Sequence, residues 1–429
     1  MTSLGLAGLV DRESSGETAV SAGELLAEVE RLAKQHESDM LALRRDLHAH
    51  PELGRSEVRT TRTVAARLRR AGLAPRLLPA TGLVCDIPAS STGAEGRTGH
   101  HASGELIALR ADIDALPVRD EKSVPYRSQV PGVCHACGHD VHTAGVLGAG
   151  LVLAELSAQG LLPRPVRLIF QPAEEIMPGG AHDVIDAGGL EGVDRIFALH
   201  CDPRLDTGRL GLTVGPITSA SDRILVRLSG QGGHTARPHL TQDVVHALGV
   251  LVSQLPAVLG RRLDPRSGVS LVWGRVTAGH VANAIPAEGW AEGTIRCLDP
   301  AAWESAPALA AELATALVAP FGVTAEVDTY RGVPPVVNDA HSVEMLRHAA
   351  TSVLGPESAV PTDQSLGAED FAWYLEHVPG ALARLGVRRP GDQVAADLHQ
   401  GTFDPDEDAI GLATRLLAAV VLVGPGVLD

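Results

Sequence analysis

Hydrophobic and polar positions are spaced differently in successive parts of the chain, and this spacing distinguishes helices from strands. In residues 22–48 and 57–70 apolar positions recur at helical spacing, which predicts two amphipathic helices. Buried strands are predicted for three short apolar runs, at residues 106–109, 166–170 and 195–199. Residues 141–156 lie between the first two runs and predict a helix. Strands that alternate with helices favour an α/β fold with a mainly parallel sheet flanked by helices.

The spacing changes near residue 220. Residues 223–229 alternate polar and apolar positions, as a half-exposed strand does. The elements predicted next are a helix (242–259), two strands (268–276 and 289–298), a helix (307–317) and a strand (323–330). This order is typical of a ferredoxin-like α+β domain. We therefore expect a smaller domain over residues 220–331, inserted into a larger domain made of residues 1–219 and 332–429.

Composition and charge narrow the class of protein. The 429 residues suffice for two or three domains at roughly 150 residues each. With 45% hydrophobic and 21% charged residues, the chain has the composition of a soluble globular protein. A nucleic-acid-binding protein needs a basic face, whereas the net charge here is −16. We therefore expect no nucleic-acid partner.

Three further features bear on the compartment. No uninterrupted apolar run reaches the roughly 18 residues of a membrane span, so we expect no membrane partner. Residues 1–20 are acidic and polar where a secretory signal would carry a basic region and a cleavage site. The five cysteines are few, odd in number and scattered, which fits reduced thiols. Together these features predict a cytoplasmic protein.

The strongest chemical signal is the run of residues 134–142, which holds two cysteines, three histidines and an aspartate. Thiolate and imidazole are ligands for divalent metals of intermediate softness. A structural zinc site would need a second ligand pair at zinc-finger spacing, and none lies nearby. A thioredoxin-like pair, Cys134 and Cys137, is the other alternative. The local sequence favours a catalytic metal site and leaves both alternatives open.

Other polar residues follow the predicted strands. Glu174 and Glu175 come after the strand at 166–170, and His200 comes directly after the strand at 195–199. His399 precedes an acidic segment near the C-terminus. Because neighbouring residues point in different directions, one glutamate can bind metal while the other faces an attacking water. Metal-assisted hydrolysis requires this division between a Lewis acid and a general base.

Taken together, these motifs resemble those of the aminoacylase and carboxypeptidase-type metallopeptidases, and specifically those of their amidohydrolase branch. That branch includes hippurate hydrolases, N-acetyl-diaminopimelate deacetylases and plant enzymes that release auxin from amino-acid conjugates. The matching stretches are residues 45–53, 109–117, 134–143, 171–175, 198–200, 232–239 and 368–371. They follow one another in the expected order, and the ordered set is highly specific.

The resemblance implies a site for two divalent metal ions. Its ligands would be Cys137, His139, Glu175, His200 and His399, with the Cys137 thiolate bridging the ions. Glu174 would be the general base. Asp112 and Asp114 would orient the ligands from behind. His135 and His142 are expected to be structural, and Cys134, where the branch commonly has methionine, is expected to face the interior.

The resemblance also implies roles for the inserted domain, as a lid and as the interface of a homodimer. His234 would reach into the active site of the second copy and stabilise the oxyanion. Asn283 and Arg296 would bind the polar groups and the carboxylate of the substrate.

The predicted activity is metal-dependent hydrolysis of the amide bond of N-acyl amino acids or similar small amides, with Glu174 as base to a metal-activated water. Mn²⁺ or Zn²⁺ is the expected metal, and Co²⁺ or Ni²⁺ is the alternative. A dipeptidase or carboxypeptidase of the same family is the alternative activity. A catalytically silent binding protein is the alternative of another class, although every expected ligand is present.

Overall fold

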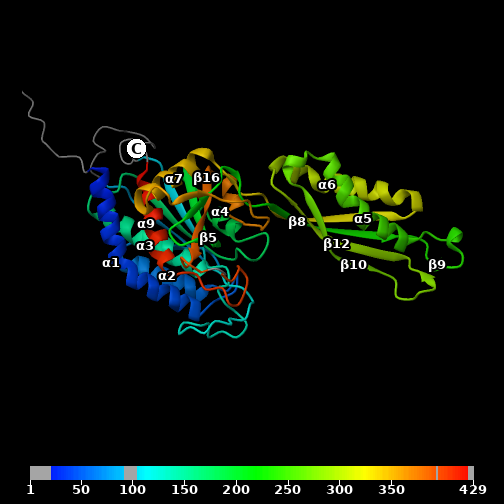
Figure 1. The fold of residues 1–429 in the computed structure, drawn as a ribbon, viewed down its shortest axis with the longest axis horizontal. Helices are drawn as coiled ribbons and strands as arrows, with labels where there is room; N and C mark the ends of the chain where they lie inside the picture. Colours follow the sequence, from blue (N-terminus) through cyan, green and yellow to red (C-terminus); the bar gives the residue numbers. More distant parts are fainter. Residues whose placement is uncertain (1–20, 91–103, 393–394, 424–429) are drawn as a thin grey trace, which may run out of the picture.

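A computed structural model describes residues 21–90, 104–392 and 395–423. The segment 1–20, used above to predict the compartment, lies outside these residues. Two sheets are set side by side along the long axis of the molecule, and each carries its own helices (Figure 1). The fold is therefore the expected α/β architecture with a smaller α+β unit inserted into it.

The large sheet has eight strands, and its centre is parallel. In spatial order the strands are β1 (Arg76–Leu77), β2 (Leu83–Ile87), β4 (Val166–Gln171), β3 (Ile107–Asp112), β5 (Arg195–Asp206), β16 (Gly380–Arg388), β6 (Leu210–Leu212) and β15 (Ala359–Pro361). β4, β3, β5 and β16 run parallel to one another. Their carboxyl ends therefore meet at one edge of the sheet, where the loops that carry function are expected.

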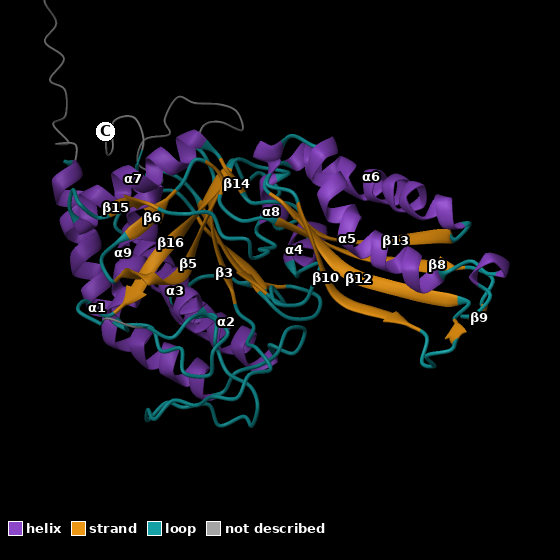
Figure 2. Ribbon diagram, turned by 45° about the vertical axis from the view of Figure 1, so that its right-hand side comes forward, coloured by secondary structure: helices purple, strands orange, loops and turns teal. Residues whose placement is uncertain are grey.

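Helices cover both faces of this sheet (Figure 2). The helices of the large unit are α1 (Ala22–Ala49), α2 (Val58–Arg70), α3 (His139–Ala158), α4 (Ala181–Asp186), α7 (Ala340–Leu354), α8 (Ala372–Leu375) and α9 (Asp408–Leu422). α1, α2, α3, α7 and α9 pack into one apolar core, whereas α4 and α8 contribute to a second core. α3 is central to the first core and buries nearly all its residues.

The smaller sheet is antiparallel, in the order β10 (Ser270–Ala278), β12 (Glu288–Cys297), β8 (Ala220–Ser229) and β13 (Thr324–Val333). α5 (Val244–Arg262) and α6 (Pro300–Val318) pack on it and form a separate core. The strand order and the alternation of elements are those of the ferredoxin-like arrangement. A short ribbon, β9 (Gly233–His234) with β11 (Ala284–Ile285), lies at the end away from the large sheet (Figures 1 and 2).

Two of the predicted boundaries differ from the structure by more than three residues. α6 begins seven residues earlier than predicted, at Pro300, because Asp299 accepts the N–H of Ala302 and caps the helix there. Proline suits the first turn of a helix. β5 continues to Asp206, so His200 lies inside the strand and not after its end.

Two helices, α3 and α5, are long and apolar enough to cross a membrane by length and composition alone, although neither is an uninterrupted apolar run. The most apolar window of α3 is 78% buried inside the protein, as in the core helix of a globular domain. α5 packs one face on the smaller sheet.

Three strands of the C-terminal part do not appear in the prediction, namely β14 (Val337–Asn338), β15 and β16. β14 pairs with β7 (Gly215–Pro216), next to the chain segment that enters the smaller unit. β16 pairs with β5, and this pairing places the C-terminal part of the chain beside the predicted site.

Candidate active site

The predicted metal ligands come from separate segments that meet at the carboxyl edge of the large sheet. Cys137 and His139 flank the start of α3, Glu175 follows β4, His200 lies in β5, and His399 lies in the loop before α9. Gly138 lies between Cys137 and His139 and has a φ of +86°, a backbone conformation that residues with a side chain rarely adopt. A Cβ added there would lie 2.7 Å from the Cys201 sulfur. The tight turn between the two ligands therefore requires glycine.

Hydrogen bonds fix the tautomers of two histidines. His139 Nδ1 lies 2.9 Å from the Asp114 carbonyl oxygen, and His200 Nδ1 lies 2.8 Å from the Cys201 carbonyl oxygen. A carbonyl oxygen only accepts, so Nδ1 carries the proton in both rings. In the neutral form of each ring, Nε2 then has a lone pair that can bind a metal ion.

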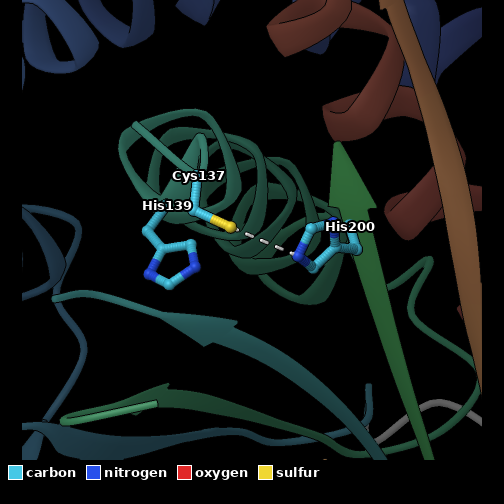
Figure 3. A group of neighbouring side chains, drawn as sticks. All are labelled: Cys137, His139 and His200. Atoms are coloured by element: carbon cyan, nitrogen blue, oxygen red, sulfur yellow. Dashed lines mark hydrogen bonds between the residues drawn. The ribbon is translucent and has the colours of Figure 1, made fainter. Parts of the chain in front are cut away.

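Cys137 connects the two halves of the ligand set. Its sulfur lies 3.6 Å from His200 Nε2 and close to the His139 ring (Figure 3). Two groups of three donor atoms, each within 4.8 Å of one another, share this sulfur: Cys137–His139–His200 and Cys137–Glu175–His399. A thiolate common to two neighbouring groups is the arrangement that a bridging ligand needs.

The two glutamates point to different neighbours. Glu175 Oε1 lies 3.3 Å from His399 Nε2 and 3.8 Å from His139 Nε2. Glu174 Oε2 lies 4.0 Å from His139 Nε2, and its carboxylate also faces Glu369 and Asp370. Glu175 therefore shares a donor group with the Cys137 sulfur, whereas Glu174 groups with His139 and Glu175 and with Glu369 and Asp370, but with neither group that contains this sulfur.

The buried atoms of this site fit divalent metal ions. His139 Nε2 and Glu175 Oε1 are buried and have no hydrogen-bond partner among the described residues. Burial raises the pKa of the Cys137 thiol, and Glu175 and Glu174 raise it further. Burial opposes charge on His139, yet Asp112, Asp114 and Glu175 raise its pKa to about 10. Divalent cations would neutralise this excess of acidic groups and bind the orphaned atoms.

The predicted orienting aspartates lie behind the ligands. Asp114 Oδ1 lies 3.2 Å from His139 Nδ1, and its other oxygen accepts the backbone N–H of Glu175 at 3.0 Å. Asp112 Oδ1 accepts from His142 Nδ1 at 2.6 Å, and His142 Nε2 accepts the N–H of Cys201 at 2.9 Å. Both ring nitrogens of His142 are therefore engaged, which leaves neither for a metal ion.

Two neighbours of the ligands are buried without charge. Cys134 is fully buried, and burial raises its pKa to about 11. Burial also lowers the pKa of His135 to about 4, and neither of its ring nitrogens has a partner among the described residues. The His135 ring is therefore neutral at pH 7.

Two buried residues behind Glu174 were assigned no role from the sequence. Arg110 donates to Asp112, Glu369 and Asp370 at 2.6, 3.1 and 2.8 Å. The free oxygen of Glu369, Oε2, is buried without a partner among the described residues. Burial raises the pKa of Glu174, and Glu369 raises it further. Both residues lie in stretches that carry the family resemblance, which is the one sequence signal that points to them.

The structure does not bring His234 and Asn283 to the ligands of the same chain. Both are exposed at the β9–β11 ribbon, where the N–H of Thr235 bonds the Asn283 carbonyl at 3.2 Å. Arg296 lies at the other end of the smaller sheet. It donates to the Leu366 carbonyl at 2.6 Å, three residues before Glu369. Burial lowers its pKa. Of these three residues, only Arg296 lies close to the large unit.

Comparison with known proteins agrees with the fold and with a metal-dependent hydrolase. Residues 108–423 match the family described as Peptidase family M20/M25/M40. The chain is 34% identical to an N-acetylcysteine deacetylase of Bacillus subtilis over 390 residues, 91% of this chain and 98% of that protein. It also shares 50% identity over 385 residues with a protein of Rhodococcus jostii that carries the name of a glutamate–cysteine ligase, of which it spans 46%. The chain superposes on the Bacillus subtilis YXEP protein with a TM-score of 0.78 at 32% identity, covering 90% of this chain and 98% of that one. That protein is described as a dinuclear metal-binding peptidase of the M20 family.

These observations define the protein as a hydrolase of the metal-dependent amidohydrolase class. The chain belongs to peptidase family M20/M25/M40, and the predicted family resemblance is confirmed.

Proposed function

We propose that this protein hydrolyses the amide bond of N-acyl amino acids with two divalent metal ions and Glu174 as general base. One observation carries the proposal: two groups of metal donors share the Cys137 sulfur, and Glu174 lies next to them in a buried position. Cys137, His139, Glu175, His200 and His399 would hold the ions. When bound, the ions supply Lewis-acid polarisation of the amide carbonyl and lower the pKa of water.

The chain's own contribution is to move a proton. Glu174 takes a proton from the attacking water, whose oxygen forms a bond to the amide carbon. The same carboxyl group then gives that proton to the nitrogen as the C–N bond breaks. Burial and the nearby Glu369 raise the pKa of Glu174, which helps it retain the proton between the two steps. The products are a carboxylic acid and a free amino acid.

We propose that the smaller unit comprises residues 220–331. We further propose that residues at both of its ends bind the substrate. Arg296 is half-buried beside the loop that leads to Glu369, and a guanidinium group suits the substrate carboxylate. The β9–β11 ribbon lies at the end of the smaller unit away from the large sheet (Figure 1), and it carries His234 and Asn283. We propose that they complete the site of a second copy in a homodimer, where His234 would stabilise the oxyanion. We further propose a cytoplasmic enzyme without nucleic-acid or membrane partners.

The test is a panel of substrates offered to metal-stripped protein after addition of Mn²⁺, Zn²⁺, Co²⁺ or Ni²⁺. N-acetylcysteine belongs on the panel because two Bacillus subtilis relatives are named as its deacetylases. Other N-acetyl amino acids and free dipeptides complete it. We expect Mn²⁺ or Zn²⁺ to restore hydrolysis of the acylated substrates.

The alternative is a peptidase, because two relatives from Saccharolobus solfataricus are named thermostable carboxypeptidases. A preference for dipeptides with a free α-amino group would favour that activity. Hydrolysis that does not depend on added metal would refute the proposed mechanism.

A further inference from the structure

We infer that Glu57 is a positioning residue for the general base, because its carboxylate holds the backbone of Ala173 in the conformation that directs Glu174 into the site. This inference rests on the proposed role of Glu174. Glu57 lies at the start of α2 and is fully buried. Its Oε1 accepts the backbone N–H of Ala173 at 2.7 Å. Its Oε2 accepts the Thr81 hydroxyl at 2.8 Å.

The capping of α2 does not explain why this glutamate is buried. Glu57 occupies the N-cap position, but its side chain caps no N–H of the helix. Glu52 serves that purpose: its two oxygens accept the N–H groups of Arg59 and Thr60 at 2.9 and 2.8 Å. A buried carboxylate is costly unless it is hydrogen-bonded, and the bonds from Ala173 and Thr81 offset this cost for Glu57.

Ala173 needs such an anchor. It is one of three non-glycine residues with positive φ in the described part of the chain, with φ +52°, and it is fully buried. L residues persist in this region only where the surroundings hold them. The Ala173 carbonyl accepts the N–H of Gly180 at 3.0 Å, so both sides of the residue are tied. The turn it forms leads directly to Glu174.

The neighbouring glutamate has an anchor of its own. Asp114 accepts the N–H of Glu175 at 3.0 Å, which fixes this predicted ligand independently of Glu57. Loss of the Glu57 carboxylate should therefore displace Glu174 more than Glu175. We expect the rate of the chemical step to fall while both metal ions remain bound.

The test compares Glu57→Ala and Glu57→Gln in the metal-loaded enzyme. Glu57→Ala should lower kcat by about 10- to 100-fold, the usual effect of a misplaced catalytic group, with KM within about threefold. Glu57→Gln should retain most of the activity, because its carbonyl oxygen can accept from Ala173 while the Thr81 hydroxyl turns to accept from its amide. Metal content should stay near that of the wild type in both variants.

Thr81→Val is the matched control, since it removes the other hydrogen bond of the same carboxylate. It should lower Tm and leave kcat nearly unchanged. A Glu57→Ala enzyme that loses stability but keeps its kcat would show that Glu57 is merely structural. If Glu57→Ala does not fold, Glu57→Asp takes its place, because its carboxylate is one methylene too short to reach Ala173.

A crystal structure of the same variant separates this inference from the proposed function. We expect Ala173 to leave the positive-φ region and Glu174 to move in Glu57→Ala, a result that needs no substrate. If the wild type hydrolyses nothing on the panel, the proposed function fails while this readout still decides the role of Glu57. An unchanged Ala173 and Glu174 would overturn the inference.

Discussion

Asp114 holds two predicted metal ligands with one carboxylate, so an isosteric change there should weaken metal binding. One oxygen faces His139 Nδ1 at 3.2 Å, and the other accepts the N–H of Glu175 at 3.0 Å. In Asp114→Asn one of these oxygens becomes an amide NH₂ that cannot accept. The variant therefore loses a charge and places two donors face to face.

The size of the effect follows from the hydrogen bond that is lost. A hydrogen bond to a charged group contributes about 1.5–3 kcal/mol. Since about 1.4 kcal/mol changes an equilibrium constant tenfold, the metal Kd should rise by about 10- to 100-fold. Loss of a residue that supports metal ligands typically has an effect of this size.

The assay is competition with a chromophoric chelator, using Zn²⁺ and Mn²⁺ in turn. Asp222→Asn is the matched control, because Asp222 is also buried and accepts N–H groups from Trp303, Gly332 and Arg331, but lies in the smaller unit. It should reduce stability without changing metal affinity. Wild-type affinity in Asp114→Asn, or equal weakening in both variants, would refute the reasoning.

Three further variants test the environment of the site. His135 has a pKa of about 4 when folded and 6.5 when unfolded, so below pH 6.5 only the unfolded chain gains its proton. Between pH 7 and pH 5 the free energy of unfolding should therefore fall by about 2 kcal/mol more in the wild type than in His135→Met. Urea unfolding at the two pH values measures this difference. Gly138→Ala should destabilise the protein more than Gly132→Ala does. The Gly132→Ala variant adds only about 1–2 kcal/mol of backbone strain, because no atom lies near the added Cβ. Thermal unfolding of the two variants compares these costs. Arg110→Leu should lower the free energy of unfolding by about 3–5 kcal/mol, since it leaves three buried carboxylates without their cation; urea titration measures this.

Each of these predictions has an outcome that contradicts it. The same pH dependence in wild type and His135→Met would mean that His135 is not buried as a neutral ring. Equal costs of the two alanine variants would show that Cys201 moves aside at no cost. An unchanged urea midpoint in Arg110→Leu would show that the carboxylates share protons and need no cation.

The elements with strong periodicity could be predicted from the sequence, and they define the fold. The strands and helices around residue 140 and the inserted unit were found because their apolar faces follow a helical or alternating pattern. β16 was missed because Gly380–Arg388 is rich in alanine, leucine and arginine, whose local preference is not for strands. Burial beside β5 overrides that preference, and no local pattern reports such burial.

The residues of the candidate site could also be predicted only in part from the sequence. Cys137, His139 and Glu175 lie in clusters of cysteine, histidine and glutamate that are visible in the sequence, whereas His200 and His399 are single histidines that the family resemblance indicated as ligands. The family resemblance also indicated Asp112 and Asp114 as orienting residues. Glu57 and Arg110 were assigned no such role, because their partners are distant: Glu57 bonds Ala173, 116 residues away, and Arg110 bonds Asp370, 260 residues away. Such contacts depend on the folded chain, so only the structure reveals them.

The central claim is that Glu174 transfers the proton while the neighbouring residues hold two metal ions. The most direct measurement determines metal content and kcat in parallel for wild type, Glu174→Gln and the exposed control Glu191→Gln. We predict about two ions per chain in all three, with kcat reduced by about 10²- to 10⁴-fold in Glu174→Gln alone. Near-normal kcat in Glu174→Gln with both ions bound would contradict the account.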